Sequence, residues 1–87
     1  MNFLHSELNL SSGDIVVVDL DKQANVRLLD NANFSKYKRG ESHSYFGGHA
    51  TKSPIRIVVP HAGIWNVVVD LGGYSGTVKA SIRTEKA

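Results

Sequence analysis

Hydrophobic and polar residues alternate along most of this chain with a period of two, the spacing of side chains on one face of a β-strand. In residues 77–84 every second side chain is apolar and the intervening ones are polar, which predicts a strand with one wet side. Residues 64–71 repeat the pattern and place Trp65 in phase with Val67 and Val69. Trp65 is therefore expected to lie in the core. Residues 55–59, bracketed by two prolines, form a further short strand.

Residues 14–20 differ because they are apolar on both faces, which indicates a central strand. Residues 26–29 follow after a short polar connection and are expected to form a hairpin with them. Residues 3–8 predict a weaker strand, and residues 42–46 an extended segment before Gly47-Gly48. A glycine-rich hairpin loop over residues 72–76 is predicted to join the last two strands.

One segment, residues 30–39, departs from the alternation. Asp30 or Asn31 can cap a short helical turn in which Phe34 and Tyr37, three residues apart, share one side. With the strands, this predicts a single all-β domain over residues 1–87. Its architecture is expected to be a small antiparallel β-sandwich or a partly open barrel of about seven strands, with one short helical turn.

The composition excludes several classes of protein. The chain has 87 residues and no cysteine, so it has room for one domain and cannot form a disulfide scaffold or a thiolate metal site. No segment approaches the roughly 18 apolar residues of a membrane span. The first residues lack the apolar stretch of a signal peptide, so a cytoplasmic location without membrane association is expected. The net charge of +2 is too mild to indicate nucleic-acid binding by itself.

The sequence contains no legible catalytic motif. Gly73-Tyr74-Ser75-Gly76 resembles part of a nucleophile elbow, but Thr77 stands where the motif requires glycine, and the loop joins two predicted strands. The four histidines lie on four segments without the spacing of a zinc pair; they are His5, His43, His49 and His61. We therefore expect no catalytic residue, no metal site and no cofactor. Whether the histidines converge in space is open at this point.

Several short motifs, in their order along the chain, resemble one small family. The motifs are Phe3-Leu4-His5, Gly13-Asp14, Ala24-Asn25-Val26-Arg27-Leu28-Leu29-Asp30, Asn33-Phe34, Tyr45-Phe46-Gly47-Gly48, Ser53-Pro54 and Trp65-x-Val67-x-Val69-Asp70-Leu71-x-Gly73-Tyr74. The chain resembles an uncharacterised bacterial domain of unknown function that occurs alone or fused ahead of TIR domains. The resemblance implies an all-β fold and a bacterial origin. It brings no catalytic residues, and the fused members suggest a sensing or docking module.

The most suggestive binding feature is the run Lys36-Tyr37-Lys38-Arg39, in which cations flank an aromatic ring. Such a run can hold phosphates while the ring stacks on a base, so a weak single-stranded nucleic-acid binder is one alternative. A merely solvated loop is another, because charge runs often serve solubility. The interpretation we favour is a non-enzymatic binding module for an unknown protein or small ligand. Its expected ligand face combines this run with Tyr45 and Tyr74, beside the two Gly-Gly loops.

Overall fold

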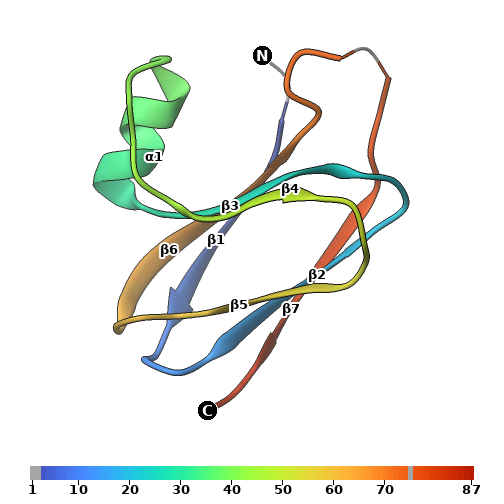
Figure 1. The fold of residues 1–87 in the computed structure, drawn as a ribbon. Coiled ribbons are helices and arrows are strands. Elements are labelled where there is room, and N and C mark those ends of the chain that lie inside the picture. The colour runs from blue at the N-terminus through green and yellow to red at the C-terminus, as the bar shows by residue number, and fades with distance from the viewer. Residues whose placement is uncertain (1–2, 75) are drawn as a thin grey trace.

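The computed structural model describes residues 3–74 and 76–87, and its seven strands form two antiparallel sheets packed face to face (Figure 1). The four-stranded sheet has the order β1-β6-β3-β4, and the three-stranded sheet the order β5-β2-β7. The strands are β1 (Phe3–Leu10), β2 (Ile15–Leu20), β3 (Ala24–Asp30), β4 (Phe46–Ala50), β5 (Ile55–Val58), β6 (Gly63–Asp70) and β7 (Ala80–Glu85). The predicted all-β class is confirmed, and the architecture is a sandwich rather than a closed barrel.

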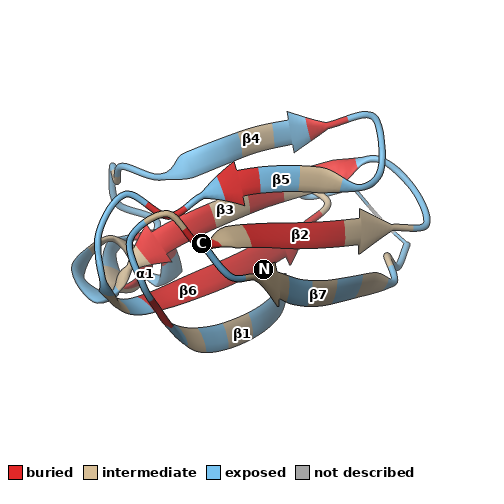
Figure 2. Cartoon of the chain, turned by 90° about the horizontal axis from the view of Figure 1, so that it is seen from below, coloured by how far each residue is buried: buried red, intermediate tan, exposed pale blue. Residues whose placement is uncertain are grey.

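The core lies between the sheets, where the alternation along each strand places one apolar set. Val16 and Val18 of β2 face Val26 and Leu28 of β3 in this core. Trp65 is only 2% exposed, so its predicted core position is confirmed. Strand β2 lies between β5 and β7, as its two apolar faces predicted. Figure 2 shows the buried residues concentrated in the central strands β2, β3 and β6.

A second, smaller core lies on the outer face of the four-stranded sheet, beneath helix α1 (Asn31–Lys38). Asp30 caps the helix, because its Oδ1 accepts a hydrogen bond from the Asn33 backbone N–H at 2.8 Å. Phe34 and Tyr37 point into the sheet and pack against Leu29 and Val68. The predicted helical turn is thus a two-turn helix that buries the outer face of β3 and β6.

Two predicted hairpins are wrong. Strands β2 and β3 belong to different sheets, and so do β6 and β7, so each connection crosses the sandwich. The apolar faces of β2 and β3 meet across the core, which buries both, whereas hairpin neighbours would share one face. The predicted loop at residues 72–76 is part of a longer connection, residues 71–79, and β7 begins at Ala80 rather than at Thr77.

The extended segment predicted over residues 42–46 lies later in the chain. Strand β4 begins at Phe46 and includes Gly47 and Gly48, which pair with Arg27 and Val26 of β3. A Cβ at Gly47 would lie 2.3 Å from the Val26 carbonyl oxygen, so only glycine permits this close pairing. Among residues 3–74 and 76–87, no helix has the length and apolar character needed to cross a membrane.

Candidate functional site

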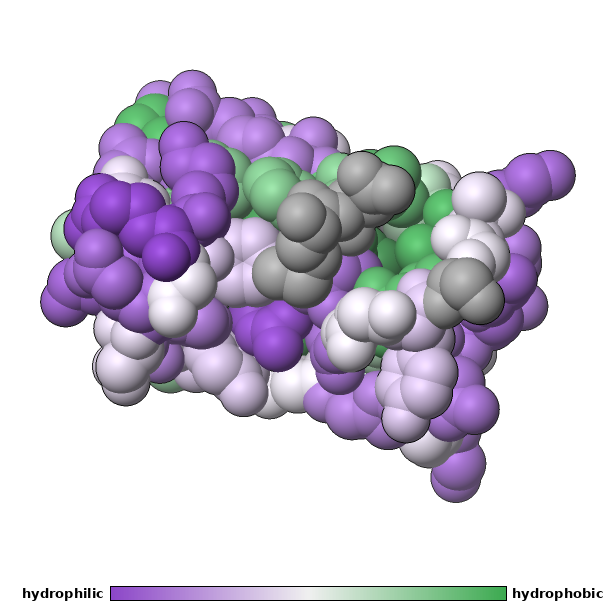
Figure 3. Space-filling model, turned by 90° about the horizontal axis from the view of Figure 1, so that it is seen from above, coloured by the Kyte–Doolittle hydropathy of each residue, from purple (hydrophilic) through white to green (hydrophobic). Residues whose placement is uncertain are grey.

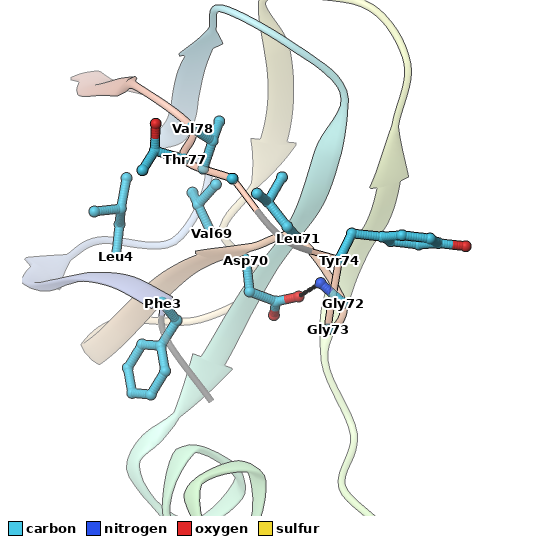
Figure 4. Close-up of a pocket in the computed structure, with 11 residues that line it drawn as sticks. Phe3, Leu4, Val69, Asp70, Leu71, Gly72, Gly73, Tyr74, Thr77 and Val78 are labelled. Atoms are coloured by element: carbon cyan, nitrogen blue, oxygen red, sulfur yellow. Dashed lines mark hydrogen bonds between the residues drawn. The ribbon is translucent and has the colours of Figure 1, made fainter.

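An apolar cleft of about 770 Å³ opens at one end of the sandwich, beside the connection from β6 to β7. This connection joins strands of different sheets, because β6 belongs to the four-stranded sheet and β7 to the three-stranded one. Leu4 of β1, Val69 of β6, Leu71 and Val78 line the cleft (Figure 4). Three of them, Val69, Leu71 and Val78, belong to the core or pack against it, whereas Leu4 is 41% exposed. The cleft is therefore an accessible extension of the core, with the size of a small-molecule site.

A buried carboxylate, Asp70, stands at the edge of this cleft and holds its surroundings together. Its Oδ1 accepts from Asn25 Nδ2 at 3.0 Å and from the Gly72 backbone N–H at 2.8 Å. Its Oδ2 accepts from Arg27 Nη1 at 2.6 Å and from the Tyr37 hydroxyl at 2.7 Å. Four donors thus saturate Asp70, and they come from β3, from helix α1 and from the loop that follows β6.

The same contacts set the ionisation of this cluster. Burial alone would raise the pKa of Asp70, but the hydrogen bonds from Asn25, Tyr37 and Gly72, with the charge of Arg27, hold that pKa below its ordinary value. Burial and the hydrogen bond to Asp70 raise the pKa of Tyr37. Asp70 is therefore a carboxylate, and Tyr37 a neutral donor, at neutral pH.

A second pocket, of about 510 Å³, lies on the other side of the same loop, and we call it the polar pocket after the polar side chains among its lining residues. Lys22 and Gln23, from the connection between β2 and β3, line it with Asn25 and His49. Asn25 donates its amide to Asp70, so its Oδ1 faces His49 Nδ1 at 3.2 Å, and His49 Nε2 lies 3.2 Å from Gln23 Oε1. The pocket is therefore lined by a cation and by hydrogen-bonding groups whose orientation Asp70 helps to fix.

Tyr74 stands between the two pockets and lines both. It is 83% exposed, and Figure 4 shows its ring directed away from Leu4 and Val78 of the cleft. It follows Gly72 and Gly73, which have φ angles of +66° and +93°, so this turn requires glycine at two successive positions. Ser75 would be the nucleophile if residues 73–77 formed a nucleophile elbow, and it lies outside the described residues.

The predicted ligand face is only partly assembled. Lys36, Lys38 and Arg39 lie at the end of α1, whereas Tyr74 belongs to the loop beside the cleft. Figure 3, which looks down on this end, shows strongly hydrophilic residues gathered on the α1 side and hydrophobic ones elsewhere on the face. Two of the cations are already engaged: Arg39 pairs with Glu41 at 2.6 Å, and the Lys38 ammonium lies 4.5 Å from the centre of the Phe34 ring.

The assignment of Tyr37 to the ligand face is corrected by its burial. Tyr37 is 4% exposed, packs edge-on against Phe3 at 5.4 Å and points into the second core, so its ring is not available to a ligand. The other predicted aromatic of this region, Tyr45, is 43% exposed. It lies 5.1 Å from the Arg27 guanidinium and 5.6 Å from His43.

Replacing Tyr37 by phenylalanine should lower the free energy of unfolding by about 1.5–3 kcal/mol, because it removes a charge-assisted hydrogen bond to a buried carboxylate. Chemical denaturation measures this change. Tyr45→Phe is the matched control, since Tyr45 is exposed and should change stability by less than about 0.5 kcal/mol. Equal stability of the two variants would contradict a structural role for the Tyr37 hydroxyl.

Sequence reasoning missed the residues that build this end of the molecule. Asn25 and Arg27 alternate with buried residues on β3. This pattern indicates that their side chains point away from the core, but it does not indicate which residue they contact. Asp70 ends an apolar strand 43 residues after Arg27, and nothing local in the sequence pairs them. Leu4 and Val78 meet at the cleft, and Lys22 and His49 at the polar pocket, although the members of each pair lie far apart in sequence.

The histidines have separate surroundings. His5 contacts Asn66 at 2.8 Å, His43 the Glu41 carbonyl oxygen at 2.8 Å, and His61 the ring of Trp65 at 4.9 Å. Within the described ranges, 3–74 and 76–87, no three His, Asp or Glu side chains gather as a metal site would require.

Comparison with known proteins gives a family without an assigned activity. No curated protein matches this chain, and no solved structure matches it. One family model, described as a domain of unknown function (DUF1883), matches residues 1–87. That match covers the strands of both sheets, helix α1 and the end of the sandwich that carries the two pockets. The chain therefore belongs to the DUF1883 family.

Proposed function

We propose that this domain is a non-enzymatic binding module whose ligand occupies the apolar cleft beside Tyr74. The observation that carries the proposal is the cleft itself: about 770 Å³ of accessible space lined by Leu4, Val69, Leu71 and Val78. A chain of this size has little apolar surface to spare, so an open extension of its core is costly unless something fills it. An almost fully exposed tyrosine at the rim adds a typical anchor for a ligand or partner.

The chemistry of the cleft supports binding rather than catalysis. A general base needs a lone pair free to accept the proton of a reacting group. Asp70, the carboxylate nearest the cleft, already accepts four hydrogen bonds, and its lowered pKa makes it a weak base. Among the described residues that line the cleft, the remaining side chains from β1, β6 and the loop are apolar apart from Thr77 and the Tyr74 hydroxyl.

Two finer predictions rest on the sequence. A sensing role connected with TIR-type signalling in bacteria follows from the family resemblance, and a cytoplasmic location is part of the same proposal. The nucleic-acid alternative depends on the ring of Tyr37 being exposed among the cations of residues 36–39. The burial of Tyr37 removes that ring, and the pairing of Arg39 with Glu41 reduces the free positive charge.

The first test uses the neutral dye Nile red, which fluoresces in apolar sites. Val78→Asp places a charge at the cleft and should abolish the fluorescence gain, whereas Val58→Asp should leave it unchanged. Val58 is the matched control because it is 61% exposed, on the three-stranded sheet and away from the cleft residues. Circular dichroism confirms that both variants fold. Unchanged dye binding in a folded Val78→Asp variant would rule out the cleft as the site.

Tyr74→Ala should leave the unfolding midpoint unchanged, because the side chain buries almost no area. It should nevertheless weaken dye binding by about 1–3 kcal/mol, the usual cost of losing an aromatic anchor. A titration and a melting curve on the same sample measure both quantities. Wild-type affinity in this variant would place the ligand deeper in the cleft, without contact to Tyr74.

A further inference from the structure

The apolar cleft and the polar pocket share one wall. Leu71, Gly72 and Tyr74 line both, so the two spaces are separated only by the first part of the loop that follows β6. A ligand that filled the cleft and extended past this wall would enter the pocket of Lys22 and His49. The two spaces therefore differ in charge, since Lys22 lines only the polar pocket.

The segment between the two spaces contains two successive glycines, Gly72 and Gly73. Gly72 and Gly73 have positive φ angles, and a Cβ at Gly72 would lie 2.8 Å from the Asn25 amide nitrogen. Gly73 has open space where a side chain would stand. At Gly73, therefore, no protein side chain occupies the space beside the backbone.

The polar pocket is lined by one lysine, Lys22. Lys22 takes part in none of the ion pairs found in the described part of the chain. The neighbouring carboxylate of Asp21 accepts the Lys79 backbone N–H, and the charge of Asp70 is balanced by Arg27 at 2.6 Å. Both ring nitrogens of His49 already contact side-chain oxygens, those of Asn25 and Gln23, so the Lys22 ammonium is the group in this pocket that can pair with an anion.

We propose that the ligand of this domain is an amphipathic anion whose apolar part fills the cleft and whose anionic group lies at Lys22. This inference rests on the proposed function and adds the class of ligand to it. An acyl or aryl carboxylate has the required chemistry, whether it is a free small molecule or the apolar C-terminal end of a peptide. Neutral and cationic amphiphiles lack the group that Lys22 would bind.

The test compares three probes of equal chain length: octanoate, octanol and octyltrimethylammonium. Each probe is titrated into the ¹⁵N-labelled protein and followed by NMR. The chemical-shift changes of the backbone amides that line the cleft and the polar pocket give the affinity and the place of binding. Octanoate should bind most tightly and shift the amides of both compartments. Lys22→Met should weaken octanoate about two- to fivefold, as expected for a partly exposed ion pair, and leave octanol unchanged. Lys36→Met, on helix α1, is the matched control and should change neither.

The outcomes separate this inference from the proposed function. If octanol binds in the cleft as tightly as octanoate, and Lys22→Met affects neither, the anionic class is wrong but the cleft still binds. Tightest binding of the ammonium probe overturns the class in the same way. If no probe perturbs the cleft residues, the proposed function fails as well. A separate comparison distinguishes a free small molecule from a peptide end. It uses one hydrophobic peptide with either a free or an amidated C-terminus. If a peptide end is the ligand, Lys22→Met should weaken the binding of the free form and leave that of the amidated form unchanged.

Discussion

Replacing Trp65 by alanine should lower the free energy of unfolding by ~3–5 kcal/mol, the largest effect that we expect of any single truncation here. The side chain is 2% exposed and lies in the core between the sheets. Its indole Nε1 donates to the His61 carbonyl oxygen at 3.0 Å, and its ring meets Phe46 edge-on at 6.1 Å. Since small domains are stable by only about 5–15 kcal/mol, this loss should unfold a measurable fraction of the protein at 37 °C.

Urea denaturation of the Trp65→Ala variant, followed by circular dichroism, measures the change. Trp65→Phe should lie between the variant and the wild type, because phenylalanine fills part of the volume but cannot donate to His61. A wild-type midpoint in Trp65→Ala would mean that the core packs without the indole, and the assigned register of β6 would be wrong.

Asp70→Asn should destabilise the protein by about 3–5 kcal/mol, because it removes one partner of a buried ion pair and leaves the Arg27 charge without compensation. The amide is also a poor replacement, since all four groups around Asp70 are donors and asparagine offers only one oxygen to accept from them. Asp19→Asn is the matched control. Asp19 pairs with Arg83 at the surface, so its loss should cost less than about 1 kcal/mol.

The pH dependence of stability gives a second measurement of the same residue. The folded-state pKa of Asp70 is held below its unfolded value. Its contribution is therefore present above the unfolded pKa, about 3.9, and is lost as the pH falls through the folded-state pKa. The Asp70→Asn variant should lose less stability than the wild type over that acid range. Equal acid dependence in both proteins would show that Asp70 titrates normally.

The strands could be predicted from the sequence because each is decided by its own alternation of apolar and polar residues. The positions of Trp65 and of β2 followed from the same pattern. Which strands become neighbours could not be predicted in this way. The connection from β2 to β3 contains only Asp21, Lys22 and Gln23, and a link so short reads as a hairpin. Here it carries the chain across the core instead, which places Val16 and Val18 opposite Val26 and Leu28.

The site was harder to predict than the fold. Tyr74 was singled out because a large aromatic between glycines is unusual in a loop, and it does line both pockets. Tyr37 was singled out for its cationic neighbours, but the outer face of β3 and β6 is apolar at Leu29 and Val68 and draws the ring inward. The sequence shows that a side chain such as Tyr37 has both an apolar ring and a polar group. Which part of the protein buries that ring depends on the order of the strands in the sheet.

The sheet order also has a consequence for how the chain acquires its structure. Strand β6 pairs with β1 on one side and β3 on the other, and β7 pairs with β2. While a ribosome is still synthesising residues 1–62, the only strand pairs that can form are β3 with β4 and β2 with β5. The indole and the valines of β6, which fill the core, are synthesised after these strands. The core can therefore form only when strands that are far apart in sequence come together. We therefore expect slow, cooperative folding that follows rather than accompanies synthesis of this domain.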